Sequence, residues 1–331
     1  MIDQLAISNL KYDDKKTKAI IANLIVLGIF GIIPILFRWS QIEINANVTI
    51  FNRCWIAALI FGLLQEVTLV VDRRGFCFEP TLKQSLDKKQ IFLLVVTSVV
   101  CFATQFLWAV SVTQTSIANA ALIHSLTPLF TTLGGWLLFN QRFNYKFLTG
   151  LGIATIGTIV LGFGDLQIAS VKLQGDLLAL LSAVFWSAYL LIVEKLRTQL
   201  TVTTIMNWIC RIQTLLFGVV ILIAGDEWFP HSRNCWLTVI ALGLTIVVAH
   251  GLLAYSLKHL SSSLVAMFNL LDPVVTAFLA WLIFAETLSW LNLVDFVVII
   301  LGIYLALTSK KGIEGQAVEF PKMSSKPINQ A

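Results

Sequence analysis

The sequence predicts an all-α integral membrane protein with ten transmembrane helices, arranged as two inverted five-helix repeats. Of the 331 residues, 57% are hydrophobic and only 12% are charged, whereas soluble domains carry about 25% charged residues. Apolar runs of about 20 residues, long enough to cross a ~30 Å hydrocarbon core, recur along the chain. A transmembrane barrel would need shorter segments of alternating polarity, and these runs do not alternate. An internal repeat relates the two halves.

Ten apolar runs define the expected helices: 19–37, 48–71, 91–112, 116–138, 147–163, 175–194, 203–224, 236–256, 262–284 and 290–308. The first run is too long for a signal peptide and lacks a small-x-small cleavage site, so we expect a retained span. The resulting organisation is a cytoplasmic tail at 1–18, a first repeat at 19–163, an external linker at 164–174, a second repeat at 175–308, and a cytoplasmic tail at 309–331 that we expect to be disordered.

The basic residues are distributed unequally between the two sides of the predicted membrane. Eighteen Lys and Arg residues lie on the side of the N-terminus and three on the other side. Because basic residues accumulate in cytoplasmic loops, both termini are expected in the cytoplasm, in the inner or plasma membrane. The net charge of +5 therefore reflects basic residues that orient the protein in the lipid bilayer. No nucleic-acid partner is expected.

The repeat appears as identities at a constant offset. Adding 145 to a residue number maps Pro128 on Pro273 and Trp136 on Trp281, with six further identities at the same offset. Each half contains five spans. Because five is odd, the second half enters the membrane from the opposite side, as in secondary transporters with a central site between inverted repeats.

Five local motifs recur in a known family: Phe51-x-Arg53-x-x-x-Ala57, Ser-Leu-Thr-Pro128-Leu-Phe, Gly175-Asp176, Leu271-Asp272-Pro273-Val274 and Glu286-Thr-Leu. With these motifs the chain resembles the EamA-type proteins of the drug/metabolite transporter superfamily over residues 19–308. The resemblance implies a five-plus-five helical fold and an exporter of amino acids, metabolites or drugs. Gln141 departs from the pattern, because that family usually carries an acid there.

Polar side chains form matching stripes in the fourth and ninth spans. By helical spacing and the repeat offset, the stripes contain Asn269, Asp272, Thr276, His124, Thr127 and Thr131. Asp272 would lie at a depth of about 15 Å, near the midplane. A carboxylate there costs about 2.5–3.5 kcal/mol on insertion scales, which suggests a role in binding substrate or protons. Alternatively, Asp272 is simply buried in a protonated or salt-bridged form.

Pro128 and Pro273 are expected to kink these two helices. Each proline lacks an N–H, so the carbonyls of His124 and Asn269 would be left as unpaired acceptors. The alternative is that the prolines only shape the helices.

Further candidates for the cavity wall lie on other spans: Gln105, Trp108, Trp186, Tyr189, Arg211 and His250. Gln105 and His250 are related by the repeat offset, although His250 could equally hydrogen-bond a neighbouring helix. His124 and His250 would suit proton coupling. We expect Arg53 to snorkel toward the headgroups, with anion recognition or pairing with Asp295 as the alternative, and Arg211 to act in binding or gating. Spans five and ten are expected to brace the core from outside, with Gly150, Gly152 and Gly157 permitting close helix contact.

No catalytic residue, metal site or cofactor is expected. The chain has no phosphate-binding loop, nucleophile elbow or metalloprotease motif, and its five cysteines form no Cys-x-x-Cys pair. We therefore expect a secondary active transporter that exports a small-molecule substrate by alternating access, with proton exchange as the energy source. The alternatives are a membrane scaffold, a lipid-modifying enzyme or a passive channel. Substrate identity and homodimer formation stay open.

Overall fold

The computed structural model describes residues 2–73, 86–115, 120, 123–164, 173–272, 274–275, 278 and 290–308, and the regular structure in these ranges is helical. The elements are α1 (Ile2–Ser40), α2 (Ala46–Arg73), α3 (Lys88–Gln114), α5 (Thr127–Phe139), α6 (Tyr145–Gly164), α7 (Leu173–Arg197), α8 (Val202–Ala224), α9 (Arg233–Thr245), η1 (Ile246–His250), α10 (Gly251–Ser256), α11 (Ser262–Phe268), η2 (Asn269–Leu271) and α13 (Trp290–Leu307). The predicted all-helical class is confirmed for these residues.

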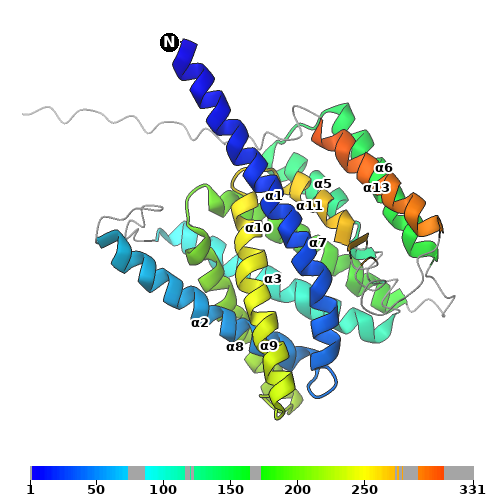
Figure 1. Ribbon diagram of the computed structural model, residues 1–331. Coiled ribbons are helices and arrows are strands. Elements are labelled where there is room, and N and C mark those ends of the chain that lie inside the picture. The colour runs from blue at the N-terminus through cyan, green and yellow to red at the C-terminus, as the bar shows by residue number, and fades with distance from the viewer. Residues whose placement is uncertain are drawn as a thin grey trace, which may run out of the picture.

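The helices follow the predicted spans in order. They differ in two ways: the first helix starts earlier than predicted, and three of the spans are interrupted. Helix α1 begins at Ile2, because residues 2–18 contain no Gly or Pro that would end a helix. The segment expected as a tail therefore extends the first helix, and Figure 1 shows it projecting beyond the bundle. Six helices in the described ranges are long and apolar enough to cross a membrane, and Ser262–Leu271 and Phe296–Leu307 are shorter apolar helices.

Three of the predicted spans are interrupted at polar positions. A turn at residues 125–126 precedes α5, a π-helical segment ending at His250 separates α9 from α10, and the 3-10 segment η2 starting at Asn269 follows α11. Short π and 3-10 segments within membrane helices commonly mark functional positions. These breaks therefore lie at, or next to, residues that the sequence singled out.

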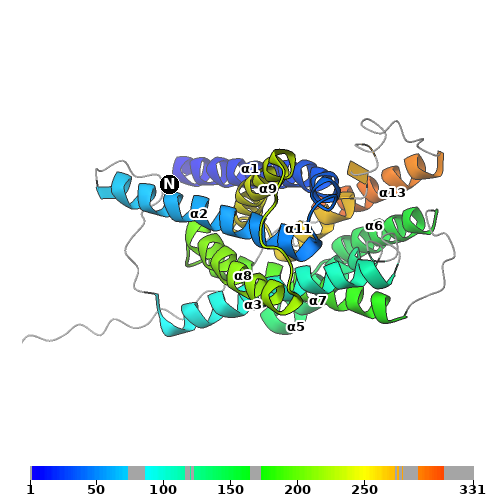
Figure 2. The same cartoon turned by 90° about the horizontal axis from the view of Figure 1, so that it is seen from below.

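The packing of the two halves is reciprocal. Helix α2 packs on α8, α5 on α11 and α6 on α13, so each of these contacts joins two helices that the sequence repeat predicts to be equivalent. Helix α3 packs on α7, and α1 packs on α9 and α10. In the predicted repeat α1 corresponds to α7, and α3 corresponds to α9 and α10, so these two contacts are also equivalent. Figures 1 and 2 show α6 and α13 side by side at one edge of the bundle, as expected of bracing helices.

Helices α6 and α13 touch through their backbones. A Cβ added at Gly150 would lie 2.5 Å from the carbonyl oxygen of Gly302, and one added at Gly302 would lie 2.5 Å from the backbone nitrogen of Ala154. A Cβ on Gly152 would meet no described atom within 4 Å. The expected close contact is confirmed at Gly150, whereas Gly152 takes no part in it.

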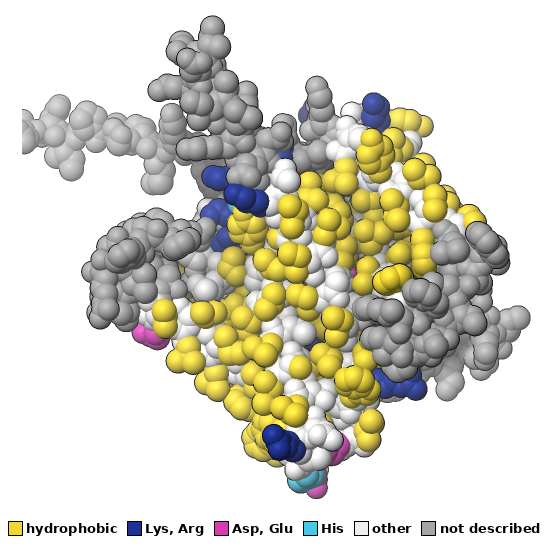
Figure 3. Space-filling view, in the orientation of Figure 1, with side chains coloured by type: hydrophobic (Ala, Val, Ile, Leu, Met, Phe, Trp, Pro, Cys, Tyr) yellow, Lys and Arg dark blue, Asp and Glu magenta, His cyan; other side chains and the backbone are white. Residues whose placement is uncertain are grey.

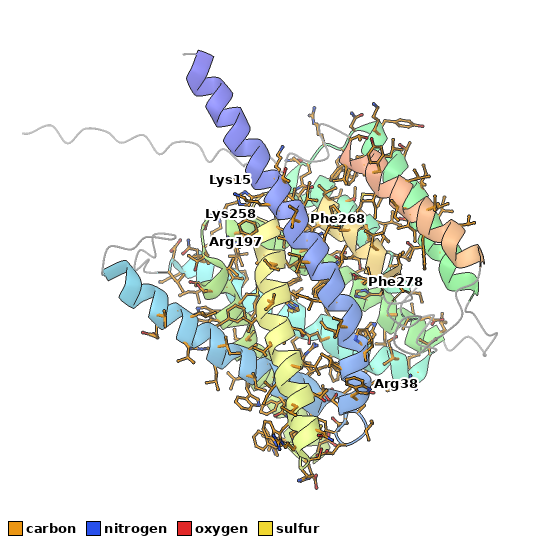
Figure 4. The ribbon with its side chains drawn as sticks, in the orientation of Figure 1. Lys15, Arg38, Arg197, Lys258, Phe268 and Phe278 are labelled. Carbon is orange, nitrogen blue, oxygen red and sulfur yellow. The ribbon has the colours of Figure 1, made fainter. Side chains whose placement is uncertain are left out.

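The surface separates apolar from charged side chains. Figure 3 shows hydrophobic side chains over the middle of one face, with basic side chains near its upper edge and charged side chains at its lower tip. Figure 4 shows Lys15, Arg197 and Lys258 gathered at one end of the bundle and Arg38 at the other. An apolar belt between charged ends is the arrangement that a bilayer requires.

Candidate functional site

Arg53 of α2 lies in the interior of the bundle. Only 8% of its surface is exposed, its Nη2 donates a hydrogen bond to Oε1 of Gln105 on α3, and its guanidinium lies 5.4 Å from the centre of the Phe37 ring on α1. A snorkelling arginine would instead extend toward the headgroups. The expectation that Arg53 snorkels is therefore wrong, because the side chain turns toward α1 and α3.

Thiols and amides surround this guanidinium. Cys54 donates to Oε1 of Gln213 on α8 at 3.3 Å, and Gln105 Nε2 donates to the sulfur of Cys101 at 3.7 Å. The sequence reasoning missed Gln213. Its signal was present, because Cys210, Gln213 and Phe217 share one buried face of α8 at helical spacing.

Aromatic side chains from α1 and α7 surround His250. The rings of Trp186 and Tyr189 are stacked with centres 4.8 Å apart, Trp186 meets His250 edge to face at 6.3 Å, and Phe30 lies 5.7 Å from His250. Helix α2, which carries Arg53, packs on the η1 segment that ends at His250, and α3, which carries Gln105, packs on α7, which carries Trp186 and Tyr189. The structure thus brings together several predicted residues with Arg53, and we call this set the Arg53 cluster: Arg53, Gln105, Trp186, Tyr189, Gln213 and His250.

The Arg53 cluster contains polar atoms that are covered but have no hydrogen-bond partner among the residues that the structure describes. These atoms are Arg53 Nε, Tyr189 OH, Gln213 Nε2 and His250 Nδ1. Each such group costs about 1–3 kcal/mol when it is left unsatisfied. Four of them in one region are typical of an interior built to hold water or a polar solute.

In the polar stripe of the fourth span, the threonine hydroxyls donate hydrogen bonds to backbone carbonyls. Thr127 donates to the carbonyl of His124 at 2.6 Å, Thr131 donates to the carbonyl of Thr127 at 2.8 Å, and Ser187 of α7 donates to the same Thr127 carbonyl at 2.9 Å. The prediction of an unpaired acceptor at His124 is wrong, because the neighbouring threonine hydroxyl satisfies it.

Pro128 is buried and lies in the first turn of α5. A proline there needs no broken hydrogen bond, because the first N–H groups of a helix have no intrahelical acceptor. Pro128 therefore starts a helix instead of kinking one. Its counterpart Pro273 falls outside the described residues, as does Thr276.

The ninth-span stripe is interrupted by η2. The carbonyl of Asn269, expected to be free, accepts the N–H of Asp272. The Oδ1 atoms of Asn269 and Asp272 are covered, and no described residue forms a hydrogen bond with them. Within the described residues no ion pair joins Asp272 to Arg53, and α11 packs on α5.

The two remaining predicted residues, Trp108 and Arg211, are not members of the Arg53 cluster. Trp108 is half-buried, one turn beyond Gln105 on α3. Arg211 is exposed and shares the outward face of α8 with Leu215 and Leu222, which are 70% and 66% exposed. The structure therefore places Arg211 outside the interior in which the sequence expected it.

Glu194 of α7 was also missed. Its carboxylate accepts hydrogen bonds from Gln141 Nε2 at 3.3 Å and from the backbone N–H of Ser262 at 3.0 Å. Gln141 was noted only for departing from a family pattern. Its partner could not be found from the sequence, because the two are 53 residues apart.

Comparisons with known proteins identify a family and several relatives of this chain. The profile of the EamA-like transporter family matches residues 17–163 and 173–308. A probable amino-acid metabolite efflux pump of Escherichia coli is 28% identical over 56% of this chain and 66% of that protein, so the chain spans slightly less than two thirds of it. The uncharacterized transporter YxxF of Bacillus subtilis is 24% identical over 90% of this chain and 92% of its own length. A solved crystal structure shares the fold with a TM-score of 0.73 at 17% identity, covering 89% of this chain and 99% of that one.

Proposed function

The chain belongs to the EamA-like transporter family, and we propose that it is a secondary active transporter that exports a small molecule by alternating access. The observation that carries this proposal is the set of unpaired polar atoms in the Arg53 cluster. These atoms lie inside a bundle of mostly apolar helices, where polar groups are expensive unless a solute or water uses them.

The reciprocal packing of the halves supports ten spans in two inverted repeats. A pair of related halves can rock against each other around a central site and open it to either side in turn. The gathering of Lys15, Arg197 and Lys258 at one end (Figure 4) supports a cytoplasmic location for that end and for both termini, in the cell membrane.

The proposed substrate site comprises the Arg53 cluster with Trp108 beside it, and Asn269 and Asp272 are proposed as a separate polar group. Asp272 is the candidate for proton exchange, with His124 and His250 as further candidates. Proton coupling can be tested in liposomes that contain the purified protein. If Asp272→Asn protein still accumulates substrate against its gradient when a pH gradient is applied, Asp272 has no part in coupling.

An efflux screen tests the transport function itself. Cells lacking related exporters would express wild-type protein or Asp272→Ala, and would be challenged with a panel of metabolites and drugs. We expect the wild type to raise tolerance to at least one compound, and the variant to lose that protection at equal expression. Tolerance unchanged across the panel would contradict the proposal. Saturable uptake and counterflow of the protective compound in liposomes would separate a carrier from a passive channel.

A further inference from the structure

We propose that the Arg53 cluster recognises the carboxylate of an organic anion whose body is aromatic or apolar. This inference rests on the proposed transport function and names the substrate class of the same site. It takes up anion recognition, which the sequence offered only as the alternative role of Arg53, and it addresses the substrate charge that the sequence left open.

The first argument is charge. A guanidinium has five N–H donors and no acceptor. The chain contains acids elsewhere, but in the described residues the Arg53 guanidinium contacts the Gln105 amide oxygen and the Phe37 ring, which are both uncharged, and no described acid forms an ion pair with it. Because a buried cation without a counter-ion is costly, the guanidinium is suited to an anion that arrives with the substrate.

The second argument is the type of polar atom left over. Of the four unpaired atoms, Arg53 Nε and Gln213 Nε2 can only donate, whereas the Tyr189 hydroxyl and His250 Nδ1 can donate or accept. The cluster therefore lacks acceptors more than it lacks donors. A carboxylate supplies two acceptor oxygens and pairs with guanidinium through two parallel hydrogen bonds. An ammonium group would find no carboxylate in the cluster.

The third argument is the wall beside these donors. The stacked rings of Trp186 and Tyr189, with Phe30 beside His250, present flat apolar surface next to the polar atoms. Small-molecule sites typically combine such walls with a few placed polar groups. The favoured ligand is thus a monoanion that joins a carboxylate to a ring or an apolar chain.

Three compounds of one size and different charge test this inference. They are phenylacetate, its neutral amide phenylacetamide, and the cation phenethylamine. Binding to purified wild-type protein would be measured by quenching of tryptophan fluorescence and by thermal stabilisation. We expect phenylacetate to bind at least about tenfold more tightly than either of the others. Equal or tighter binding of the amide or the amine, or no binding of phenylacetate, would overturn the inference without any variant.

Variants then assign the selectivity to one residue. Arg53→Gln should lose about tenfold or more in phenylacetate affinity, and Arg53→Lys should retain part of it because the charge stays while the two-pronged geometry is lost. Arg211→Gln is the matched control, since that arginine faces outward, and it should bind like the wild type. Unchanged affinity in folded Arg53→Gln protein would overturn the inference.

Counterflow in liposomes separates this inference from the transport proposal. Saturable exchange of phenethylamine without any preference for phenylacetate would support a transporter and overturn the anion site. Tight, Arg53-dependent binding of phenylacetate without exchange would support the site and contradict transport of that anion.

Discussion

Glu194 accepts the backbone N–H of Ser262 at 3.0 Å with one carboxylate oxygen, while its other oxygen accepts Gln141 Nε2 at 3.3 Å. Ser262 is the first residue of α11, after the N-cap Ser261, where a helix favours negative charge. The carboxylate therefore ties the C-terminal part of α7 to the start of α11 and to the segment between α5 and α6.

Removing this carboxylate should loosen the start of α11. We expect Glu194→Ala to destabilise the protein by about 1–3 kcal/mol, the usual cost when a hydrogen bond to a charged group is removed. Glu194→Gln should cost less, because an amide oxygen can still accept from Ser262. Thermal denaturation and hydrogen exchange at residues 262–268 would measure both effects.

Glu66 offers a control for Glu194, because it is an exposed acid on α2. Glu66→Ala should leave stability within about 0.5 kcal/mol of the wild type. Unchanged exchange in α11 of Glu194→Ala protein would mean that the hydrogen bond to Ser262 does not hold the helix.

The backbone contact between α6 and α13 predicts a sharp difference between two glycines of the same helix. Gly150→Ala would place a methyl group 2.5 Å from the Gly302 carbonyl oxygen, so the helices must separate. We expect a loss of about 1–3 kcal/mol, as for overpacked sites. Gly152→Ala meets no described atom within 4 Å and should be neutral or stabilising, by up to about 1 kcal/mol from helix propensity. Equal melting temperatures for the two variants would contradict the contact.

The sequence predicted the site best where repeat symmetry and helical period could be combined. Gln105 and His250 were paired by the repeat offset, and both belong to the Arg53 cluster. Depth along a helix was less informative, because it does not say which way a side chain points. Arg53 and Arg211 were assigned opposite positions from depth, and the structure reverses these positions, because Arg53 is buried and Arg211 is exposed. For Arg211 the helical period would have helped, since it shares a face with Leu215 and Leu222, away from Cys210 and Gln213.

Other features could not be predicted because they depend on which residue supplies the hydrogen-bond partner. A missing proline N–H implies a free carbonyl, yet the Thr127 hydroxyl takes the one at His124. Glu194 and Ser262 are 68 residues apart, and nothing in the local pattern of either residue indicates the other.

Pro128 at the start of α5 predicts a mild effect for its replacement. A proline that kinks a helix interior would, when removed, straighten the helix and change its stability by about 3 kcal/mol. In the first turn it mainly restricts the unfolded chain, so Pro128→Ala should cost less than about 1 kcal/mol and preserve the protection measured in the efflux screen. A stability change above 2 kcal/mol would show that Pro128 does more than start the helix.

The connection between α1 and α9 predicts a pH-dependent contact at the opposite end from Lys15. Glu43, in the turn after α1, accepts hydrogen bonds from the Ser232 hydroxyl and N–H and from the N–H of His231. The Ser232 hydroxyl bond is the main reason that the pKa of Glu43 is lowered. His231 pairs with Glu227, and this hydrogen bond raises the pKa of His231.

The stabilising contribution of Glu43 should be lost at low pH, and that of His231 at high pH. The lowered pKa of Glu43 means that its contribution is complete above its ordinary pKa and is lost as the pH falls through the lowered value. The raised pKa of His231 means that its contribution is complete below its ordinary pKa of 6.5 and is lost as the pH rises through the raised value. Hydrogen exchange at residues 232–236, compared with wild type at the same pH, should therefore be faster in His231→Gln at pH 6, with the difference gone by about pH 9. Glu43→Gln should exchange faster than wild type throughout that range. A His231→Gln effect that persists at high pH, or that survives 1 M salt undiminished, would contradict a charged pair at this exposed site.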